Sequence, residues 1–423
     1  MTTRIMKRIV KDRFFLKVLV LACLFPTVVM GQATQTPTLE EVFPFLKGFK
    51  GNSINQRADG NSVIIPAPNY SGNPIYSNGM VGIQYRVLGK YGFADSKGQI
   101  MKDRFIWDTF SGQGDPEFHC GAVIMRNSND YKAYIIRKDG TKTLINGAIC
   151  KATAFNDDGI AAVVDNCKLG NDVISREYVK YINTKGQWVY RKCWTKYVNK
   201  LVNLSAFKNG RALFYDNYKK AYGIVNKQGV IVRQANLPAE QYGFSDGVAR
   251  IYKGGSYSVI DMTGKELFTI NGRNIDVDDF HCGYSVVKLA YRKFVMIDKT
   301  GKIVSKEYER MSPFFPNGLA LAQRYDGDTE VLNTKMEMVR TIDMSISDRY
   351  NEKPFTPQYY KGIIDWNGCL VDFYGNRISY DYNFIKFPVD GDLILVTGDN
   401  HKFAGYLNRV TGKIVSYFGE DEF

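Results

Sequence analysis

The stretch FKNGRALF from Phe207, followed by YGIVNKQGVIV from Tyr222, decides the fold of this chain. Its first phrase is an aromatic residue, two or three further residues, Gly, any residue, and then small or apolar residues. Its second phrase, some 15 residues later, is aromatic-Gly-apolar-apolar-Asn/Asp-x-x-Gly. A phrase that recurs along a chain indicates one supersecondary unit that is copied many times.

Nine copies of the first phrase occur between residues 76 and 391. From Phe207 to Phe315 the copies repeat every 35 to 37 residues, and the spacing drifts towards both ends, as expected of capping units in a repeat array. The copies are Tyr76–Gly79, Phe118–Gly121, Phe155–Gly159, Phe207–Gly210, Phe244–Gly247, Phe280–Gly283, Phe315–Gly318, Tyr359–Gly362 and Phe387–Gly391.

Each first phrase predicts a turn that leads into a strand. In GRALFYD, Ala212 and Phe214 alternate with Arg211, Leu213 and Tyr215, which is the two-residue period of a β-strand. The Gly is expected to supply a positive φ at the turn. We expect the aromatic residues of both phrases to pack between neighbouring units, because repeated apolar positions form the shared core of such arrays.

The second phrase predicts a hairpin. Asn or Asp begins the turn because its side chain bonds the backbone two residues on, and Gly closes it because a left-handed residue needs no Cβ. Full turns begin at Asp95, Asn183, Asn226, Asp261 and Asp298; Arg137–Gly140 lacks the cap, Asn333–Met336 lacks the Gly, and Asn408–Gly412 has one extra residue. Gly229→Val is therefore expected to harm expression more than a change at His119.

The repeats resemble a known family. YGFADSKG at Tyr91, YGIVNKQG at Tyr222 and FSDGVARI at Phe244 are similar to WG repeats, also called KWG repeats, over roughly residues 76–415. The Trp of the family's name is Tyr, Phe or absent here. The resemblance implies a β-repeat protein of a kind common among bacterial exported and surface proteins. It implies no single activity, and no catalytic residue carries over.

These patterns predict an all-β fold in which tandem repeats form a β-propeller-like ring. Closure into a ring removes exposed strand edges. An open twisted β-array or solenoid is the alternative, because the short central period leaves little room for a fourth strand in each unit.

The first 31 residues have the pattern of a signal peptide. A basic start precedes an apolar run from Val18 to Met30, and the small residues Val29 and Gly31 occupy the positions that a signal peptidase reads. An uncleaved anchor and a lipoprotein modified at Cys23 are the alternatives. We expect export to the periplasm, the cell surface or the medium, with no transmembrane span once the signal peptide is removed.

Three segments follow from this reading. Residues 1–31 are the signal peptide, residues 32–70 are a linker or irregular segment with one element around Leu39 to Phe49, and residues 71–423 are the repeat domain of about nine units. Residues 1–31 hold six of the 56 basic residues and one of the 43 acidic ones, so the remainder keeps a net charge of +8. These charges are scattered as on an ordinary surface, and we expect no nucleic-acid partner.

Six cysteines lie beyond residue 31, too few and too scattered for a disulfide scaffold. One bridge among Cys150, Cys167 and Cys193 is expected, because these residues lie in neighbouring units. The connectivity cannot be deduced from spacing.

Histidine beside cysteine occurs twice in an identical FHCG, at His119-Cys120 and at His281-Cys282, and the third histidine is His401. Such a pair raises the possibility of a metal or a thiol nucleophile. The two copies are four units apart, and a zinc site needs three or four converging ligands. We therefore interpret these residues as tolerated turn residues.

Two acidic stretches resemble fragments of calcium loops, namely Asp276, Asp278 and Asp279, and Asp326 with Asp328. Neither has the ligand spacing and closing Glu of a calcium loop, so solvated turns are the favoured interpretation. The sequence therefore assigns no catalytic, cofactor-binding or metal residue, and no cofactor.

The leading hypothesis is a non-enzymatic binding or scaffold protein of the cell envelope with an unknown protein or glycan partner. Variable loops, such as Tyr131 to Asp139 and Asp390 to Lys402, are expected to carry recognition. The alternative is an envelope hydrolase that acts on glycan or peptide with spatially assembled carboxylates.

Overall fold

Strands make up almost all of the regular structure in the computed structural model. The structure describes residues 36–51, 53–54, 63–66, 76–85, 89–95, 99, 101, 106–110, 116–156, 158–167, 176–190, 210–216, 219, 221–227, 230–237, 243–253, 255–272, 275–344, 346, 354–366, 368–381, 384–388, 391–397 and 404–419. The chain divides into two compact units, residues 1–36 and residues 37–423. Only Thr36 of the first is described, so the fold below is that of the second.

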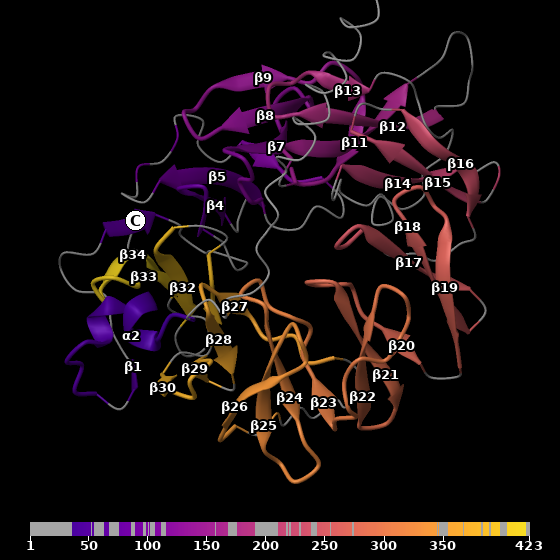
Figure 1. Cartoon of the computed structure of the whole chain (residues 1–423). Coiled ribbons are helices and arrows are strands. Elements are labelled where there is room, and N and C mark those ends of the chain that lie inside the picture. Colours follow the sequence, from indigo (N-terminus) through magenta and orange to yellow (C-terminus); the bar gives the residue numbers. More distant parts are fainter. Residues whose placement is uncertain are drawn as a thin grey trace, which may run out of the picture. The chain divides into compact units, whose positions relative to one another are not determined.

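The described strands of residues 37–423 form eight sheets, and the fold is an eight-bladed β-propeller if each sheet is counted as one blade. The sheets follow one another in chain order around a ring (Figure 1), and the ring is closed where β3 lies against β32. The expected all-β propeller is confirmed, and the open array is not.

The nine repeats fit into eight sheets because the seven-stranded sheet holds two of them. Unit 1 contains β3 (Tyr76–Ser77), β4 (Met80–Tyr85) and β5 (Lys90–Asp95), and β6 (Trp107–Asp108) joins it to unit 2, with β7 (Ala122–Asn127), β8 (Ala133–Arg137) and β9 (Lys142–Leu144). Unit 3 contains β10 (Ile149–Ala152), β11 (Ile160–Cys167), β12 (Arg176–Asn183) and β13 (Trp188–Tyr190).

Units 4 to 6 each have three described strands and unit 7 has four. Unit 4 contains β14 (Arg211–Asp216), β15 (Ala221–Asn226) and β16 (Ile231–Leu237), and unit 5 contains β17 (Val248–Lys253), β18 (Ser256–Asp261) and β19 (Glu266–Asn271). Unit 6 contains β20 (Asp276–Val277), β21 (Tyr284–Ala290) and β22 (Lys293–Asp298), and unit 7 contains β23 (Arg310–Met311), β24 (Leu319–Gln323), β25 (Thr329–Asn333) and β26 (Met338–Ile342).

The last two units are five-stranded because the N-terminal segment adds a strand to each. Unit 8 contains β27 (Tyr359–Tyr360), β28 (Ile363–Trp366), β29 (Cys369–Asp372) and β30 (Arg377–Tyr380), and unit 9 contains β31 (Phe384–Lys386), β32 (Leu393–Thr397), β33 (Ala404–Asn408) and β34 (Ile414–Gly419). The added strands are β1 (Ser53–Ile54) beside β30 and β2 (Val63–Pro66) beside β34, both parallel.

The Gly of the first phrase has a positive φ in all nine copies, as expected. In unit 1 the residue before it is also left-handed, with φ 51° at Asn78 and 79° at Gly79, between the paired residues Ser77 and Met80. Two positive φ values in a two-residue loop define the type I′ turn of tight hairpins. Cys120, Asp246, Cys282 and Lys361 take the place of Asn78 in four other units.

The second phrase forms the expected hairpin. In unit 6 the Asp298 carboxylate accepts hydrogen bonds from the backbone N–H groups of Thr300 and Lys302, and Gly301 has φ 83°. Where the phrase lacks its Gly, Met336 takes the left-handed place with φ 62°. Gly229 lies outside the described residues.

The Gly of this hairpin also makes room for the preceding unit. A Cβ added at Gly301 would lie 2.7 Å from the ring of Phe268 in β19 of unit 5. The same relation joins unit 2 to unit 3, where a Cβ at Gly186 would lie 2.7 Å from Thr143 in β9. The outer strand of one unit is thus packed on the hairpin of the next.

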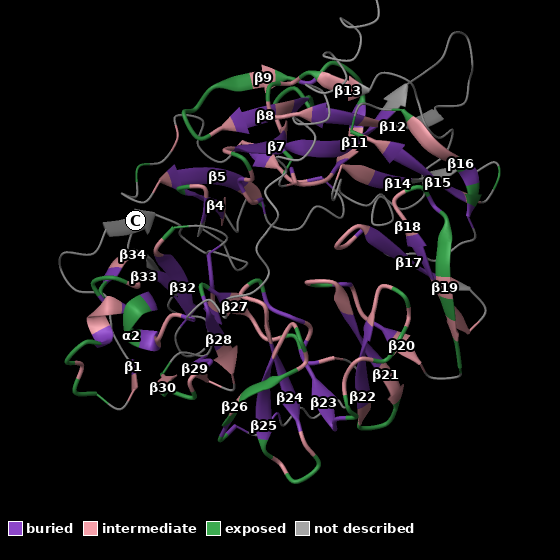
Figure 2. Ribbon diagram, viewed as in Figure 1, coloured by how far each residue is buried: buried purple, intermediate pink, exposed green. Residues whose placement is uncertain are grey.

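Aromatic residues of both phrases line the contacts between units, as expected. Phe118, Phe155, Phe244 and Phe280 are each at most 2% exposed. Tyr222 of β15 packs in one cluster with residues of β17 and β18. Figure 2 shows the inner strands buried and the outer strands β9, β19 and β26 largely exposed. Phe207 lies outside the described residues.

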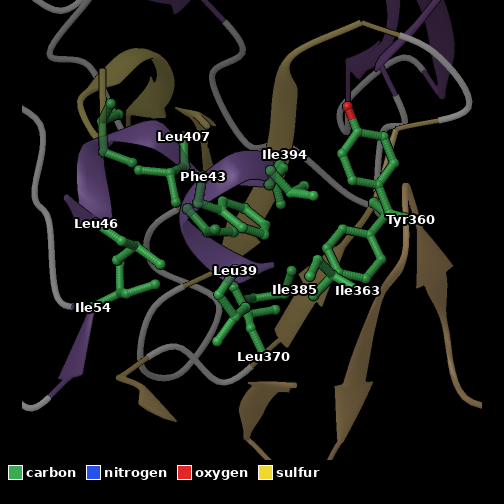
Figure 3. Close-up of a cluster of buried hydrophobic side chains, with 14 residues drawn as sticks. Leu39, Phe43, Leu46, Ile54, Tyr360, Ile363, Leu370, Ile385, Ile394 and Leu407 are labelled. Atoms are coloured by element: carbon green, nitrogen blue, oxygen red, sulfur yellow. The ribbon is translucent and has the colours of Figure 1, made fainter. Parts of the chain in front are cut away.

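Within the segment expected as a linker, residues 38–46 form a helical element that packs on the last two units. Helix α2 (Leu39–Val42) begins with a capping box between Thr38 and Glu41, and the 3₁₀ turn η1 (Pro44–Leu46) follows. Leu39 and Phe43 enter one apolar cluster with residues of units 8 and 9 (Figure 3). This segment is therefore part of the propeller's packing.

Candidate binding face

The strand order gives the propeller two different ends. Successive strands of a unit are antiparallel, so both motif turns of each unit lie at one end, which we call the turn end. The loops between the strand that follows the first phrase and the strand that carries the second phrase, and the connections to the next unit, lie at the opposite end, which we call the loop end. The repeat pattern fixes the turn end, whereas the loops at the other end differ between units.

Three equivalent loops of the loop end each present an exposed tyrosine. Tyr131 lies between β7 and β8, Tyr291 between β21 and β22, and Tyr325 between β24 and β25. Their exposed fractions are 74%, 69% and 57%. Tyrosine offers a large, rigid contact area with a polar tip, which suits protein and ligand interfaces.

Tyr131 combines this exposure with an unfavourable backbone conformation. Its φ is 57°, a value that costs a residue with a Cβ about 1–2 kcal/mol relative to the right-handed region. Its N–H donates to the Asn127 carbonyl at 2.8 Å. Strain at an exposed bulky residue contributes nothing to the core, and it is typical of functional sites.

Tyr325 is fixed against the neighbouring unit. Its hydroxyl lies 2.8 Å from Glu307 Oε1 and 2.9 Å from the Arg292 carbonyl oxygen. Arg292, which follows Tyr291, is paired with Glu309. Burial and the bond to Glu307 raise the pKa of Tyr325 to about 12. The tyrosine loops of units 6 and 7 are therefore held together, and the Tyr325 phenol stays protonated at neutral pH.

A buried carboxylate supports the same region. Glu330 of β25 is 2% exposed and accepts bonds from the Tyr308 hydroxyl at 2.6 Å and from Lys306 Nζ at 2.9 Å. Burial alone would raise the pKa of Glu330, but the bonds from Lys306 and Tyr308 outweigh it, and the pKa lies below its usual value. Glu330 is therefore charged and satisfied, and it has the environment of a structural group.

The two FHCG copies lie in turns of different units, 2 and 6. The His119 ring lies 3.3 Å from Glu117, and the Cys120 thiol lies within 3.5 Å of the Asn156 carbonyl of the next unit. Cys282 lies in the same way 3.8 Å from the Phe315 carbonyl. The described residues contain no group of three His, Cys, Asp or Glu side chains that could hold a metal. His401 lies outside them.

The acidic stretches are engaged by neighbouring side chains. Asp276 accepts a bond from the Tyr257 hydroxyl at 2.9 Å, and Asp279 is paired with Arg250 at 2.7 Å. Burial raises the pKa of Asp278, which accepts a bond from the Asp279 N–H at 2.8 Å.

Both acids of the second stretch face one cation. Asp326 and Asp328 lie 3.1 Å and 2.5 Å from the guanidinium of Arg324. This ion-paired loop is the one that carries Tyr325.

The two segments expected as recognition loops each contain a strand, so their description as loops is wrong. β8 lies within Tyr131 to Asp139 and β32 within Asp390 to Lys402. Of the first segment, only the Tyr131 tip belongs to the loop end. The sequence analysis missed Tyr291 and Tyr325, although each is an aromatic residue between two strand patterns.

The expected disulfide stays a prediction. Cys150 is half-buried against an apolar cluster of units 3 and 4. Cys193 lies outside the described residues, and the structure describes only the backbone of Cys167.

Three cavities are lined by described residues of the propeller. Their volumes are about 260 Å³ beside Trp366 and Arg377, about 350 Å³ beside Leu39 and Phe49, and about 800 Å³ beside Lys180. The described lining of each contains at most one carboxylate, so the described residues of these cavities do not supply the carboxylate pair of a glycoside hydrolase. In the part of the chain that is described, no helix is long and apolar enough to cross a membrane.

Comparison with known proteins agrees with the repeat pattern. The family model described as WG containing repeat matches residues 296–327, which supports the identification of these repeats as WG repeats. A search of curated proteins finds no match.

Solved structures with a similar course of the chain include three at low identity. A crystal structure of the eukaryotic initiation factor has a TM-score of 0.49 at 10% identity and covers 79% of this chain and 93% of its own. The crystal structure of BamB from Moraxella catarrhalis has a TM-score of 0.31 at 13% identity and covers 72% of this chain and 84% of its own. The structure of the Dos1 propeller has a TM-score of 0.36 at 10% identity and covers 78% of this chain and 92% of its own.

Proposed function

We propose that this protein is a non-enzymatic binding or scaffold protein of the cell envelope, and that a protein or glycan partner docks on the loop end. A β-propeller of WG repeats is consistent with such a role. The observation that carries the proposal is Tyr131, which is 74% exposed with φ 57°. Folding gives no reason to keep a bulky residue there, because Gly or Asn would remove the strain.

The remaining loop-end contacts support a binding surface. Tyr325 is pre-organised by Glu307 and Arg292, so a partner meets an aromatic side chain that has already lost much of its freedom. Exposed aromatic anchors with fixed neighbours are the usual centres of binding energy at interfaces.

Quantitative capture tests the binding role. The immobilised full chain is exposed to an envelope extract, and captured proteins and glycans are compared with those held by a variant carrying Tyr131→Ala, Tyr291→Ala and Tyr325→Ala. A matched variant at the turn end carries Val230→Ala, Ile303→Ala and Val410→Ala, whose parent side chains are 58%, 51% and 42% exposed.

We expect a specific partner to be lost from the tyrosine variant and kept by the turn-end variant. Equal capture by both variants would remove the loop end as the binding surface. Turnover of a cell-wall glycan or peptide by the purified chain would contradict the non-enzymatic role.

The proposed location rests on the sequence of residues 1–31. We expect cell fractionation to place the protein in the envelope or medium, with a mature chain that begins at Gln32. Recovery of an intact Met1 in the cytosol would contradict export.

A further inference from the structure

The outer edges of units 8 and 9 accept an additional strand. β1 pairs with β30 through Ser53↔Ser379 and Ile54↔Tyr380, and β2 pairs with β34 from Val63↔Ser416 to Pro66↔Gly419. Both added strands are parallel to the outer strand that they join. This chain therefore shows how an extended, β-branched segment docks on the outer strand of its own units.

β19 of unit 5 is the outer strand most open to the same addition. It is the last strand of the sheet β17-β18-β19, and in the described residues no further strand pairs with it. Its ladder with β18 is regular from Phe268 to Asn271. The segment Leu267-Phe268-Thr269-Ile270 carries no charge and no Pro, and Leu267 is 42% exposed.

Other described outer strands have the features that protect an edge. β9 and β13 have three residues each, and β9 contains Lys142. β16 contains Arg233 and two register shifts, and β26 contains Arg340. Short length, basic side chains and irregular pairing are the devices by which proteins discourage strand addition. β19 has one register shift, at Leu267, and one charged residue, Glu266, but from Phe268 to Asn271 it has neither a shift nor a charge.

We propose that β19 is a strand-addition site that binds an extended, β-branched, uncharged segment of a partner protein in parallel orientation. Backbone hydrogen bonds supply affinity in this mode of recognition, and alternate side chains supply selectivity. A second copy of this chain is less suited, because a two-fold dimer that continues the sheet through β19 is antiparallel, opposite to both additions seen here. This inference rests on the proposed binding role but assigns a surface other than the loop end.

The probe is a fluorescent peptide with the sequence of residues 61–67, NSVIIPA, which contains β2. Its binding to the full mature chain is followed by fluorescence anisotropy. We expect saturable binding that Leu267→Lys and Thr269→Lys each weaken at least about tenfold, because a basic side chain on an edge strand opposes pairing. Val410→Lys places the same charge on an exposed apolar residue of the turn end and should leave binding unchanged.

Two modified peptides test for strand pairing itself. One is N-methylated at Ile64 and the other at Ile65. N–H groups of successive residues in a strand point to opposite sides, so only one of these two N–H groups can bond to β19. One of the two peptides should lose binding and the other should keep it.

Several outcomes overturn the proposal. They are absence of peptide binding, equal binding to all Lys variants, equal binding of both N-methylated peptides, or a dimer in sedimentation that Leu267→Lys dissolves. Each would remove β19 as a partner site while capture at the loop-end tyrosines remained intact.

Discussion

Phe268 and Gly301 meet across the boundary between units 5 and 6, where the ring of one would lie 2.7 Å from a Cβ on the other. The Gly of the second phrase is therefore required twice, once for its φ of 83° and once for the space that it leaves. The turn of unit 6 thus leaves space for a side chain of the preceding unit's outer strand.

Gly301→Ala is expected to destabilise the protein more than Gly283→Ala. Both positions have a positive φ, and each change costs about 1 kcal/mol for the left-handed conformation. Nothing lies within 4 Å of a Cβ at Gly283, whereas at Gly301 the clash with Phe268 adds about 1–3 kcal/mol. Urea unfolding of both variants measures the difference, and equal midpoints would contradict the packing role of Gly301.

Phe43→Ala should lower the free energy of unfolding by about 3–5 kcal/mol, the usual cost of removing a buried phenylalanine. Phe43 is 0% exposed in the cluster of Figure 3, between α2 and units 8 and 9. Phe49 is only partly buried against the same cluster and provides the control, since Phe49→Ala should cost clearly less. Thermal unfolding of both variants checks this order.

Asp278→Asn should stabilise the protein at neutral pH and lose this advantage in acid. Burial raises the pKa of the Asp278 carboxyl above its usual value, with smaller opposing effects of the Asp279 N–H, Arg250 and His281 and a reinforcing effect of the Asp279 charge. A carboxyl with a raised folded pKa favours folding while it is protonated, and this contribution is lost as the pH rises through that pKa. Unfolding free energies measured between pH 4 and pH 7 should converge towards acid, and a constant difference would refute the cause.

Tyr131→Gly should be more stable than Tyr131→Ala by about 1 kcal/mol, because only Gly relieves a left-handed backbone. Both variants should lose the partner that the loop end binds. Denaturation gives the first quantity and the capture experiment the second. If either variant keeps full capture, the strained tyrosine has no role in binding.

The sequence predicts the fold from a small set of residues. The turns at Gly283 and Asp298 can be predicted from the local sequence, because a positive φ and a capping carboxylate have strong residue preferences. The contact of Phe268 with Gly301 depends on how units stack, and no spacing reveals it. Met336 shows the converse, since a residue with no preference for φ 62° takes it where the surrounding hairpin demands it.

The candidate site was less accessible to sequence reasoning. Tyr325 is held in place by Arg292 and Glu307, which come from two other segments of the chain. The local sequence around Tyr325 therefore does not predict its orientation. The chain has 28 tyrosines, and the repeat pattern predicts packing for aromatic residues, so the sequence does not single out the exposed tyrosines. Tyr131 carries the same difficulty, because its strained φ appears only in the structure.

The cap formed by α2 makes the two ends of the chain depend on each other during synthesis. The Leu39 N–H binds the Asp372 carboxylate 333 positions later, and Arg409 binds the Val42 carbonyl across 367 positions. The first residues of the propeller to leave the ribosome therefore cannot bury Phe43 until almost the whole chain has been synthesised. In a truncated chain the apolar face of α2, with Leu39 and Val42, has no partner and is open to chaperones and proteases, so only the complete polypeptide buries it.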